Sequence, residues 1–119
     1  MIIQKFEDCI AWQRSQELAV AISLVFRDLN DYGFKDQILR SVLSISNNIA
    51  EGFERSSDAD FKRFLYIASG SCSETKSMLY LSQKLRYISE EKALQLIMQA
   101  SEISRIIRGL IKSLSVRAT

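Results

Sequence analysis

The chain has 119 residues, enough for one domain that buries about two-thirds of its unfolded surface, and no linker or repeat divides it. It contains no proline and four glycines, so little interrupts long helices, and its apolar fraction of 47% fits a folded globular protein. A net charge of +2 excludes strong global steering toward nucleic acid. Two cysteines without metal spacing, and no histidine, exclude the common metal sites. We expect one all-α domain over residues 1–119 that binds no cofactor.

The first expected helix covers residues 7–31. Glu7 and Asp8 suit its N-terminus because negative charge is favourable there. Gly33 is placed to end the helix, since glycine readily takes the left-handed conformation that closes helices. The core row recurs at alternating steps of four and three, which is the spacing of one helix face: Ala11, Ser15, Leu18, Ile22, Val25 and Leu29.

The second expected helix, residues 35–55, carries two neighbouring rows of residues. The apolar row predicts a buried face. The polar row beside it is either a solvated face or a place where polar groups meet a neighbouring helix or subunit. The apolar row is Ile38, Val42, Ile45, Ile49 and Phe53, and the polar row is Arg40, Ser44, Asn48, Glu51 and Arg55.

Two more helices follow after short turns. Ser57 is predicted to cap the third helix, with Asp60 three residues on, and Ser89 to cap the fourth. The third helix carries two adjacent rows between Phe61 and Ile88, and the fourth carries an unbroken row from Ala93 to Leu114. Helices of this length joined by short turns predict an antiparallel up-down-up-down four-helix bundle.

Small residues inside these helices predict close approaches between helices. Glycine costs about 1 kcal/mol relative to alanine in a helix interior, so each helical glycine has a local reason. Residues 68–73 are small throughout. We interpret four positions as close packing, within the bundle or between subunits, with a ligand surface as the alternative: Gly52, Gly70, Ser71 and Gly109.

The carboxylates Glu51 and Glu74 are the ones that acid–base or metal chemistry would use. A di-metal bundle also needs Glu-x-x-His pairs, and Ser44 has no histidine to activate it. The sequence therefore predicts no enzyme. The residues are interpreted as a polar network or a subunit interface formed by Arg40, Ser44, Asn48, Glu51, Arg55 and Glu74.

Basic residues gather at one end of the expected bundle. No acid follows Glu102. In an antiparallel bundle the start of the third helix lies near the end of the fourth, which joins their cations into one basic end. Such a cluster can bind nucleic-acid phosphates with little reading of sequence, although helix C-termini also favour cations for dipole reasons alone. The candidate nucleic-acid-binding residues are Lys62, Arg63, Arg105, Arg108, Lys112 and Arg117.

More apolar surface is patterned than four helices need, which predicts a homo-oligomer. No apolar run approaches the ~20 residues that span a bilayer, so we expect no membrane partner. Cys9 and Cys72 lie in helical patterns and are interpreted as buried reduced thiols, which predicts a cytoplasmic location.

Several motifs resemble one known family. They are Ala11-Trp12-Gln13, Ser44-Ile45, Asn48-Ile49-Ala50-Glu51-Gly52, Phe64-Leu65, Gly70-Ser71 with Glu74, and Gly109-Leu110. In these residues the chain is similar to the 23S rRNA intervening-sequence protein family over most of its length. One departure is Asp31-Tyr32-Gly33-Phe34, where the family usually has a proline-containing loop.

The resemblance implies a small bacterial four-helix bundle without established enzymatic activity. A related protein, the accessory variability determinant of diversity-generating retroelements, forms a pentameric, positively charged barrel that binds nucleic acid and a reverse transcriptase. Two hypotheses follow. The first is a non-catalytic homo-oligomer, a ring such as a pentamer, that binds RNA or DNA non-specifically through a basic surface. The alternative is a scaffold or adaptor for protein partners without direct nucleic-acid binding.

Overall fold

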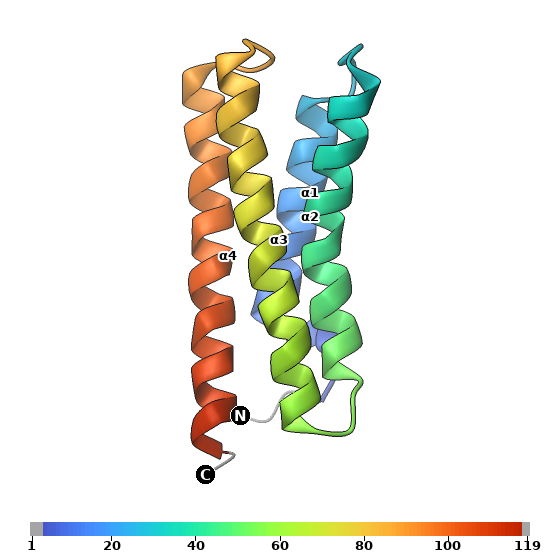
Figure 1. Cartoon of the computed structure of the whole chain (residues 1–119), viewed down its shortest axis with the longest axis vertical. Coiled ribbons are helices and arrows are strands. Elements are labelled where there is room, and N and C mark those ends of the chain that lie inside the picture. Colours follow the sequence, from blue (N-terminus) through green and yellow to red (C-terminus); the bar gives the residue numbers. More distant parts are fainter. Residues whose placement is uncertain (1–3, 118–119) are drawn as a thin grey trace.

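The computed structural model of the chain describes residues 4–117, with the side chain of Arg117 outside the described part. A short 3-10 turn, η1, precedes the helices, and successive helices run in opposite directions (Figure 1). Each helix packs against the next one along the chain, and the first closes against the last. The predicted antiparallel four-helix bundle is thus confirmed. The elements are η1 Phe6–Asp8, α1 Ile10–Val25, α2 Tyr32–Phe53, α3 Asp58–Lys84 and α4 Glu90–Arg117.

The bundle buries the predicted apolar rows with one exception, because the second row of α3 is exposed at Ile67, Leu81 and Leu85. Ile38, Val42, Ile45 and Ile49 of α2 have no exposed surface, and Cys9 and Cys72 are buried free thiols. Polar groups also enter the core between α2 and α3, where the hydroxyl oxygens of Ser41 and Thr75 lie 3.0 Å apart in a hydrogen bond. Every buried side-chain nitrogen or oxygen in residues 4–117 has a hydrogen-bond partner. The core is therefore closed and satisfied.

The connection between α1 and α2 differs from the prediction. The expectation that helix one extends over 7–31 and ends at Gly33 is wrong, because α1 ends at Val25 and Gly33 lies in the first turn of α2. The Asp31 carboxylate accepts a hydrogen bond from the Phe34 backbone N–H at 3.1 Å, which caps α2 and starts it at Tyr32. No glycine in the described residues takes a positive φ.

The other helix ends follow their capping chemistry. The hydroxyls of Ser57 and Ser89 accept hydrogen bonds from backbone N–H groups three residues on, as predicted. The end of α3 has no glycine, and Arg86 takes the left-handed conformation with φ of 64°. The Arg86 N–H donates to the Gln83 carbonyl and the Tyr87 N–H to the Ser82 carbonyl, each at 2.9 Å. This pair of bonds is the Schellman motif.

Asp31 also joins the two turns at one end of the bundle. The Tyr87 hydroxyl donates to the Asp31 carboxylate at 2.5 Å, and the Tyr87 ring packs edge-on against Phe34. The hydrogen bond from Tyr87, followed by that from the Phe34 N–H, lowers the pKa of the Asp31 carboxyl below its usual value. The same bond raises the pKa of the Tyr87 hydroxyl.

Replacing Tyr87 with Phe is expected to lower Tm most near neutral pH. A carboxyl whose pKa is lower in the folded state stabilises the fold fully above its unfolded-state pKa. That contribution is lost as the pH falls through the folded-state pKa. Thermal unfolding of wild type and Tyr87→Phe should therefore converge in acid. A Tm difference that stays constant from neutral to acidic pH would show that the bond to Asp31 contributes nothing.

Within residues 4–117, none of the helices combines the length and apolarity that a bilayer crossing requires.

Candidate functional site

The outer face of α4 carries the strongest positive charge pattern. Arg105, Arg108 and Lys112 are exposed there, at spacings of three and four that place them on one side of the helix. The Arg108 guanidinium donates to the Ser104 hydroxyl at 3.0 Å. Within residues 4–117, no carboxylate forms an ion pair with Arg105 or Lys112. These charges are thus available to an outside anion.

Gly109 lies among these cations. A Cβ atom built there would meet nothing within 4 Å, and the residue is exposed. The helix surface at Gly109 is therefore uncovered, which leaves room there for an outside group. The face we call the basic face of α4 consists of Arg105, Arg108, Gly109 and Lys112.

The start of α3 lies against the end of α4, as the antiparallel topology predicts. The Lys62 ammonium donates to the Ser115 hydroxyl at 3.3 Å. Lys76, which the sequence reading did not select, lies on the same side of α3, since it is fourteen residues, close to four helical turns, beyond Lys62. The position of Lys76 could have been predicted from the sequence, because its spacing from Lys62 places both lysines on one helix face.

Arg63 belongs to a different part of the surface. Its guanidinium lies over the Phe64 ring, 4.7 Å from the centroid, and the Arg55 guanidinium lies over the same ring at the same distance. Arg63 also contacts Asp60 at 3.8 Å. The structure therefore separates Arg63, at the α2 side of α3, from the basic face of α4. The side chain of Arg117, another predicted member, lies outside the described residues.

Cys72 is the nearest thiol to this region. Burial raises the pKa of the Cys72 thiol to about 12, and the nearby charges of Lys76 and Arg108 oppose that rise. A thiol with so high a pKa stays protonated near neutral pH, and the thiolate is the reactive form. Cys72 is therefore a packing residue and not a nucleophile. Its interaction with both cations also places Lys76 and Arg108 along the same α3–α4 seam.

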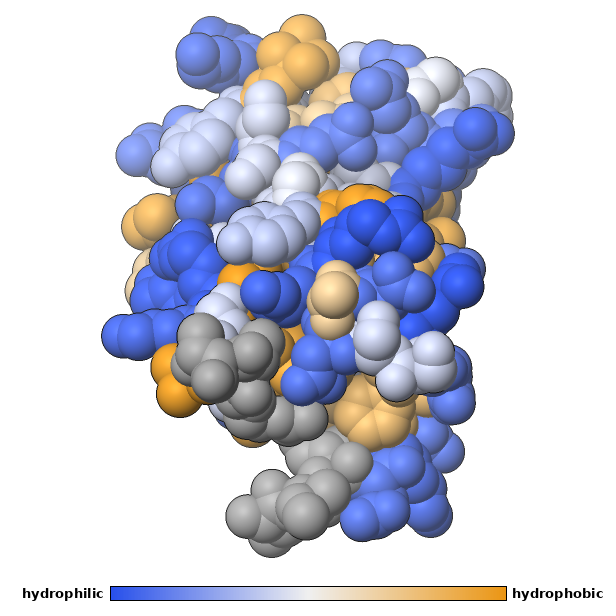
Figure 2. Space-filling view, turned by 60° about the horizontal axis from the view of Figure 1, so that its bottom comes forward, coloured by the Kyte–Doolittle hydropathy of each residue, from blue (hydrophilic) through white to orange (hydrophobic). Residues whose placement is uncertain are grey.

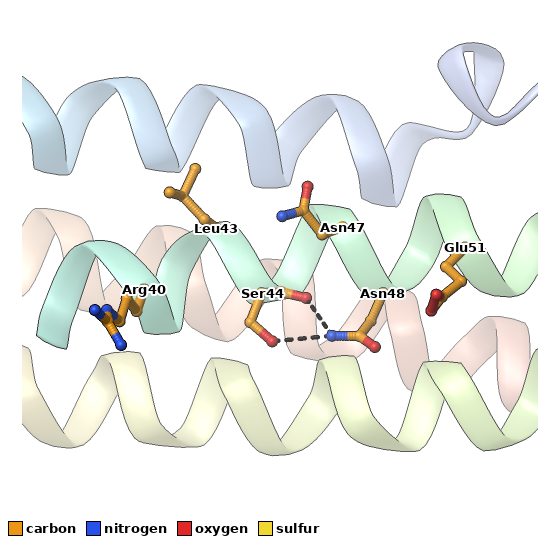
Figure 3. A pocket seen from close by; sticks show the side chains of 6 residues that line it. All are labelled: Arg40, Leu43, Ser44, Asn47, Asn48 and Glu51. Carbon is orange, nitrogen blue, oxygen red and sulfur yellow. Dashed lines mark hydrogen bonds between the residues drawn. The ribbon is translucent and has the colours of Figure 1, made fainter. Parts of the chain in front are cut away.

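All members of the predicted polar row except Arg55 line a groove of about 440 Å³ on α2, together with Leu43 and Asn47. Figure 3 shows Leu43 and Asn47 directed toward α1, whereas Ser44 and Asn48 point toward α3. The Asn48 amide donates to the Ser44 carbonyl at 2.8 Å and to its hydroxyl at 2.9 Å. The groove is lined by Arg40, Leu43, Ser44, Asn47, Asn48 and Glu51.

The polar network forms only in part. The Ser71 hydroxyl donates to the Ser44 hydroxyl at 2.9 Å, which links α3 to the row on α2. Glu51 and Arg55 approach to 3.8 Å. Within residues 4–117, Arg40 and Glu74 are exposed and form no ion pair with each other, so these two do not join the network, and their place in a subunit interface stays a prediction. The free Arg40 leaves one end of the groove positively charged.

The groove offers little for catalysis. Ser44 accepts hydrogen bonds from its neighbours and has no basic side chain to take its proton. Among residues 4–117, no group of three or more histidine, cysteine, aspartate or glutamate side chains is placed to hold a metal ion. What remains is a polar surface with one cation, Arg40, and one carboxylate, Glu51.

The glycines that were interpreted as close-packing positions differ in how near the neighbouring helix lies. A Cβ atom on Gly52 would lie 2.6 Å from Cβ of Phe64 and 3.1 Å from Cδ1 of Phe61, so α2 and α3 meet most closely there. Gly70 and Gly109 have open space around them. The prediction of close packing within the chain is therefore wrong for Gly70 and Gly109. Close packing between subunits stays a prediction for these two residues.

Exposed apolar side chains lie on all four helices, and α1 and α4 carry four of the most exposed. Val20, Leu24, Leu94 and Met98 are each more than half exposed. An ion pair between Arg14 and Glu102 joins the two antiparallel helices. Val20 and Leu24 follow Arg14 along α1, and Met98 and Leu94 precede Glu102 along α4. All four residues therefore lie on the same side of the ion pair along the bundle axis, at similar distances from it. Seen toward the end with the α2–α3 turn, hydrophilic residues dominate and apolar ones form separate patches (Figure 2).

The sequence matches the 23S rRNA-intervening sequence protein family over residues 7–109. The chain belongs to this family. A crystal structure of a protein with unknown function from the S23 ribosomal protein family of Bacteroides thetaiotaomicron VPI-5482 is similar, with a TM-score of 0.80 and 32% identity. The similarity covers 86% of this chain and 98% of that one. No curated protein matches the chain.

The resemblance noted in the sequence is thus confirmed. The family match includes Gly52, the α2 groove, Arg105 and Arg108, and it ends at Gly109. Lys112 lies beyond the matched residues. The basic face of α4 therefore combines positions within the family match with a cation that follows it.

Proposed function

We propose that this family member is a non-catalytic, homo-oligomeric protein that binds RNA or DNA non-specifically. The observation that supports this proposal is the basic face of α4, where Arg105, Arg108 and Lys112 are exposed and form no ion pair within residues 4–117. Glu102, one turn before Arg105, pairs with Arg14 instead. Side chains of this kind bind phosphate oxygens and release condensed counterions, and that gives affinity without reading bases.

Self-association would raise the number of phosphate contacts, which is small for one chain. Three cations make few phosphate contacts, and a net charge of +2 adds little long-range attraction. Repeating the basic face in a homo-oligomer, such as a ring, multiplies the contacts and makes later ones intramolecular. Exposed Val20, Leu24, Leu94 and Met98 supply apolar surface that a subunit contact would bury.

The test is the native mass of nuclease-treated protein by light scattering, followed by titration of a fluorescent oligonucleotide at two salt concentrations. We expect a defined oligomer whose affinity falls on the order of a thousandfold between about 50 and 200 mM salt, if about six phosphates are contacted. Binding that is absent, or that does not change with salt, would contradict the proposal. A monomer would contradict its homo-oligomeric part.

The groove on α2 supports a second proposed function, a scaffold for a protein partner. Arg40 and Asn47 line the groove, and neither makes a side-chain hydrogen bond or ion pair within residues 4–117. A protein segment could satisfy both. A pull-down from nuclease-treated lysate that recovers one protein in stoichiometric amount would support this function, and recovery of nucleic acid alone before nuclease treatment would support the first.

A further inference from the structure

We infer that the seam between α3 and α4 binds single-stranded nucleic acid in preference to duplex, with an unpaired base stacked on the ring of Tyr66. This inference rests on the proposed nucleic-acid binding and specifies its substrate class. It begins from an exposed aromatic side chain, since the Tyr66 side chain is 62% exposed. Tyr66 takes part in no aromatic pair and no hydrogen bond among residues 4–117.

The geometry of α3 places Tyr66 nearer to the side that faces α4 than to the side that faces α2. Lys62 marks that side, because its ammonium contacts Ser115 of α4. Ser71 marks the opposite side, because its hydroxyl contacts Ser44 of α2. At about 100° per residue, Tyr66 lies about 40° around the helix from Lys62 and about 140° from Ser71. Tyr66 is also about 120° from the buried Cys72, so its ring lies on the outer surface of α3, nearer to α4 than to α2.

The heights of the residues place Tyr66 beside the cations. Lys62 and Ser115 are level with each other, and the two helices are antiparallel. One turn along α3 from Lys62 reaches Tyr66, and one turn back along α4 from Ser115 reaches Lys112. One further turn along each helix reaches Gly70 and Arg108. A cation thus lies level with the ring and another lies one turn away.

Further along α3, Tyr80 repeats the arrangement. It is fourteen residues beyond Tyr66, close to four turns, and is 52% exposed. Ser73 lies midway on the same face and is exposed, so no large side chain covers the surface between the two rings. Lys76 lies one turn before Tyr80. The seam thus alternates aromatic rings, cations and small residues.

This combination fits unpaired bases. Surfaces that bind single strands join a positively charged track for the backbone to aromatic rings on which successive bases stack. In a duplex the base faces are already stacked on each other and are closed to a protein ring. Cations alone bind both forms through phosphate. The tyrosine rings are therefore what separates the two substrates.

The experiment compares a single-stranded thymine oligonucleotide with a duplex of the same length, at one salt concentration. Tyr66→Leu removes the ring, Tyr66→Phe keeps it, and Tyr32→Leu is the control, because Tyr32 is equally exposed at the start of α2. We expect Tyr66→Leu to weaken single-strand binding about tenfold and leave duplex binding unchanged. Tyr66→Phe and Tyr32→Leu should bind like wild type.

The outcomes separate the inference from the proposed function. If wild type binds neither nucleic acid, the proposed function is wrong and the inference falls with it. If wild type binds but Tyr66→Leu loses nothing, or loses equally for single strand and duplex, only the inference is overturned. Circular dichroism of each variant establishes that it is folded, and Tyr80→Leu, which removes the second exposed ring, carries the comparison if Tyr66→Leu does not fold.

Discussion

Replacing Gly52 with Ala is expected to lower the free energy of unfolding by up to about 2 kcal/mol. The added Cβ would lie 2.6 Å from Cβ of Phe64, which is fixed to the α3 backbone and cannot rotate away. The two helices must therefore move apart, and such overpacking costs about 1–3 kcal/mol. Alanine regains about 1 kcal/mol of helix propensity, which offsets part of that cost. Urea unfolding of the two proteins measures the difference.

Gly70→Ala and Gly109→Ala are the matched controls. Both glycines are helical and have nothing within 4 Å of a built Cβ. Each replacement should raise stability by up to about 1 kcal/mol through helix propensity. If Gly52→Ala were stabilising like the controls, the close approach of α2 to α3 would be refuted. If Gly70→Ala instead disrupted the native oligomer, that glycine would lie in a subunit contact.

Much of this fold could be predicted from the spacing of apolar residues. The row from Ile38 to Ile49 is buried in α2 as expected, and the serine caps at Ser57 and Ser89 form. These features depend on local chemistry and helical periodicity alone. The antiparallel order follows from the short turns, and it correctly brought Lys62 near the end of α4.

The connections were harder to predict because two local signals competed. Gly33 offered a helix end, but the Asp31 side chain caps α2 first, and its bond from Tyr87 comes from a turn 56 residues away in sequence. Arg86 takes a left-handed conformation that usually belongs to glycine, so the sequence contains no signal for it. Tertiary contacts determine the backbone conformation both at the start of α2 and at the end of α3.

The charged residues of the candidate site could be predicted from sequence. Which neighbouring helix each of them faces could not. Arg105, Arg108 and Lys112 share a face because of their spacing, which sequence shows directly. By sequence alone Arg63 is equivalent to Lys62, its neighbour. Its contact with the Phe64 ring, which packs at Gly52, places it toward α2 instead. Only the packing of α2 on α3 distinguishes the two cations.

Replacing Arg108 and Lys112 together with Glu is expected to weaken nucleic-acid binding at least tenfold. The variant loses two phosphate contacts in each engaged subunit and gains two repulsive charges. Each lost contact makes the plot of log K against log salt shallower by about 0.7 to 0.9. The slope should therefore become shallower by roughly 1.4 to 1.8 for each engaged subunit. Both residues are exposed, so the fold should tolerate the change.

The matched control is Arg27→Glu with Lys84→Glu. Both double variants change the net charge from +2 to −2, but Arg27 and Lys84 are exposed at the opposite end of the bundle. Comparing the salt slopes of these two variants with wild type is the most direct test of the basic face of α4. We predict a shallower slope and weaker binding for the α4 variant and nearly unchanged binding for the control. Equal losses in both variants, or none in the α4 variant, would contradict the assignment.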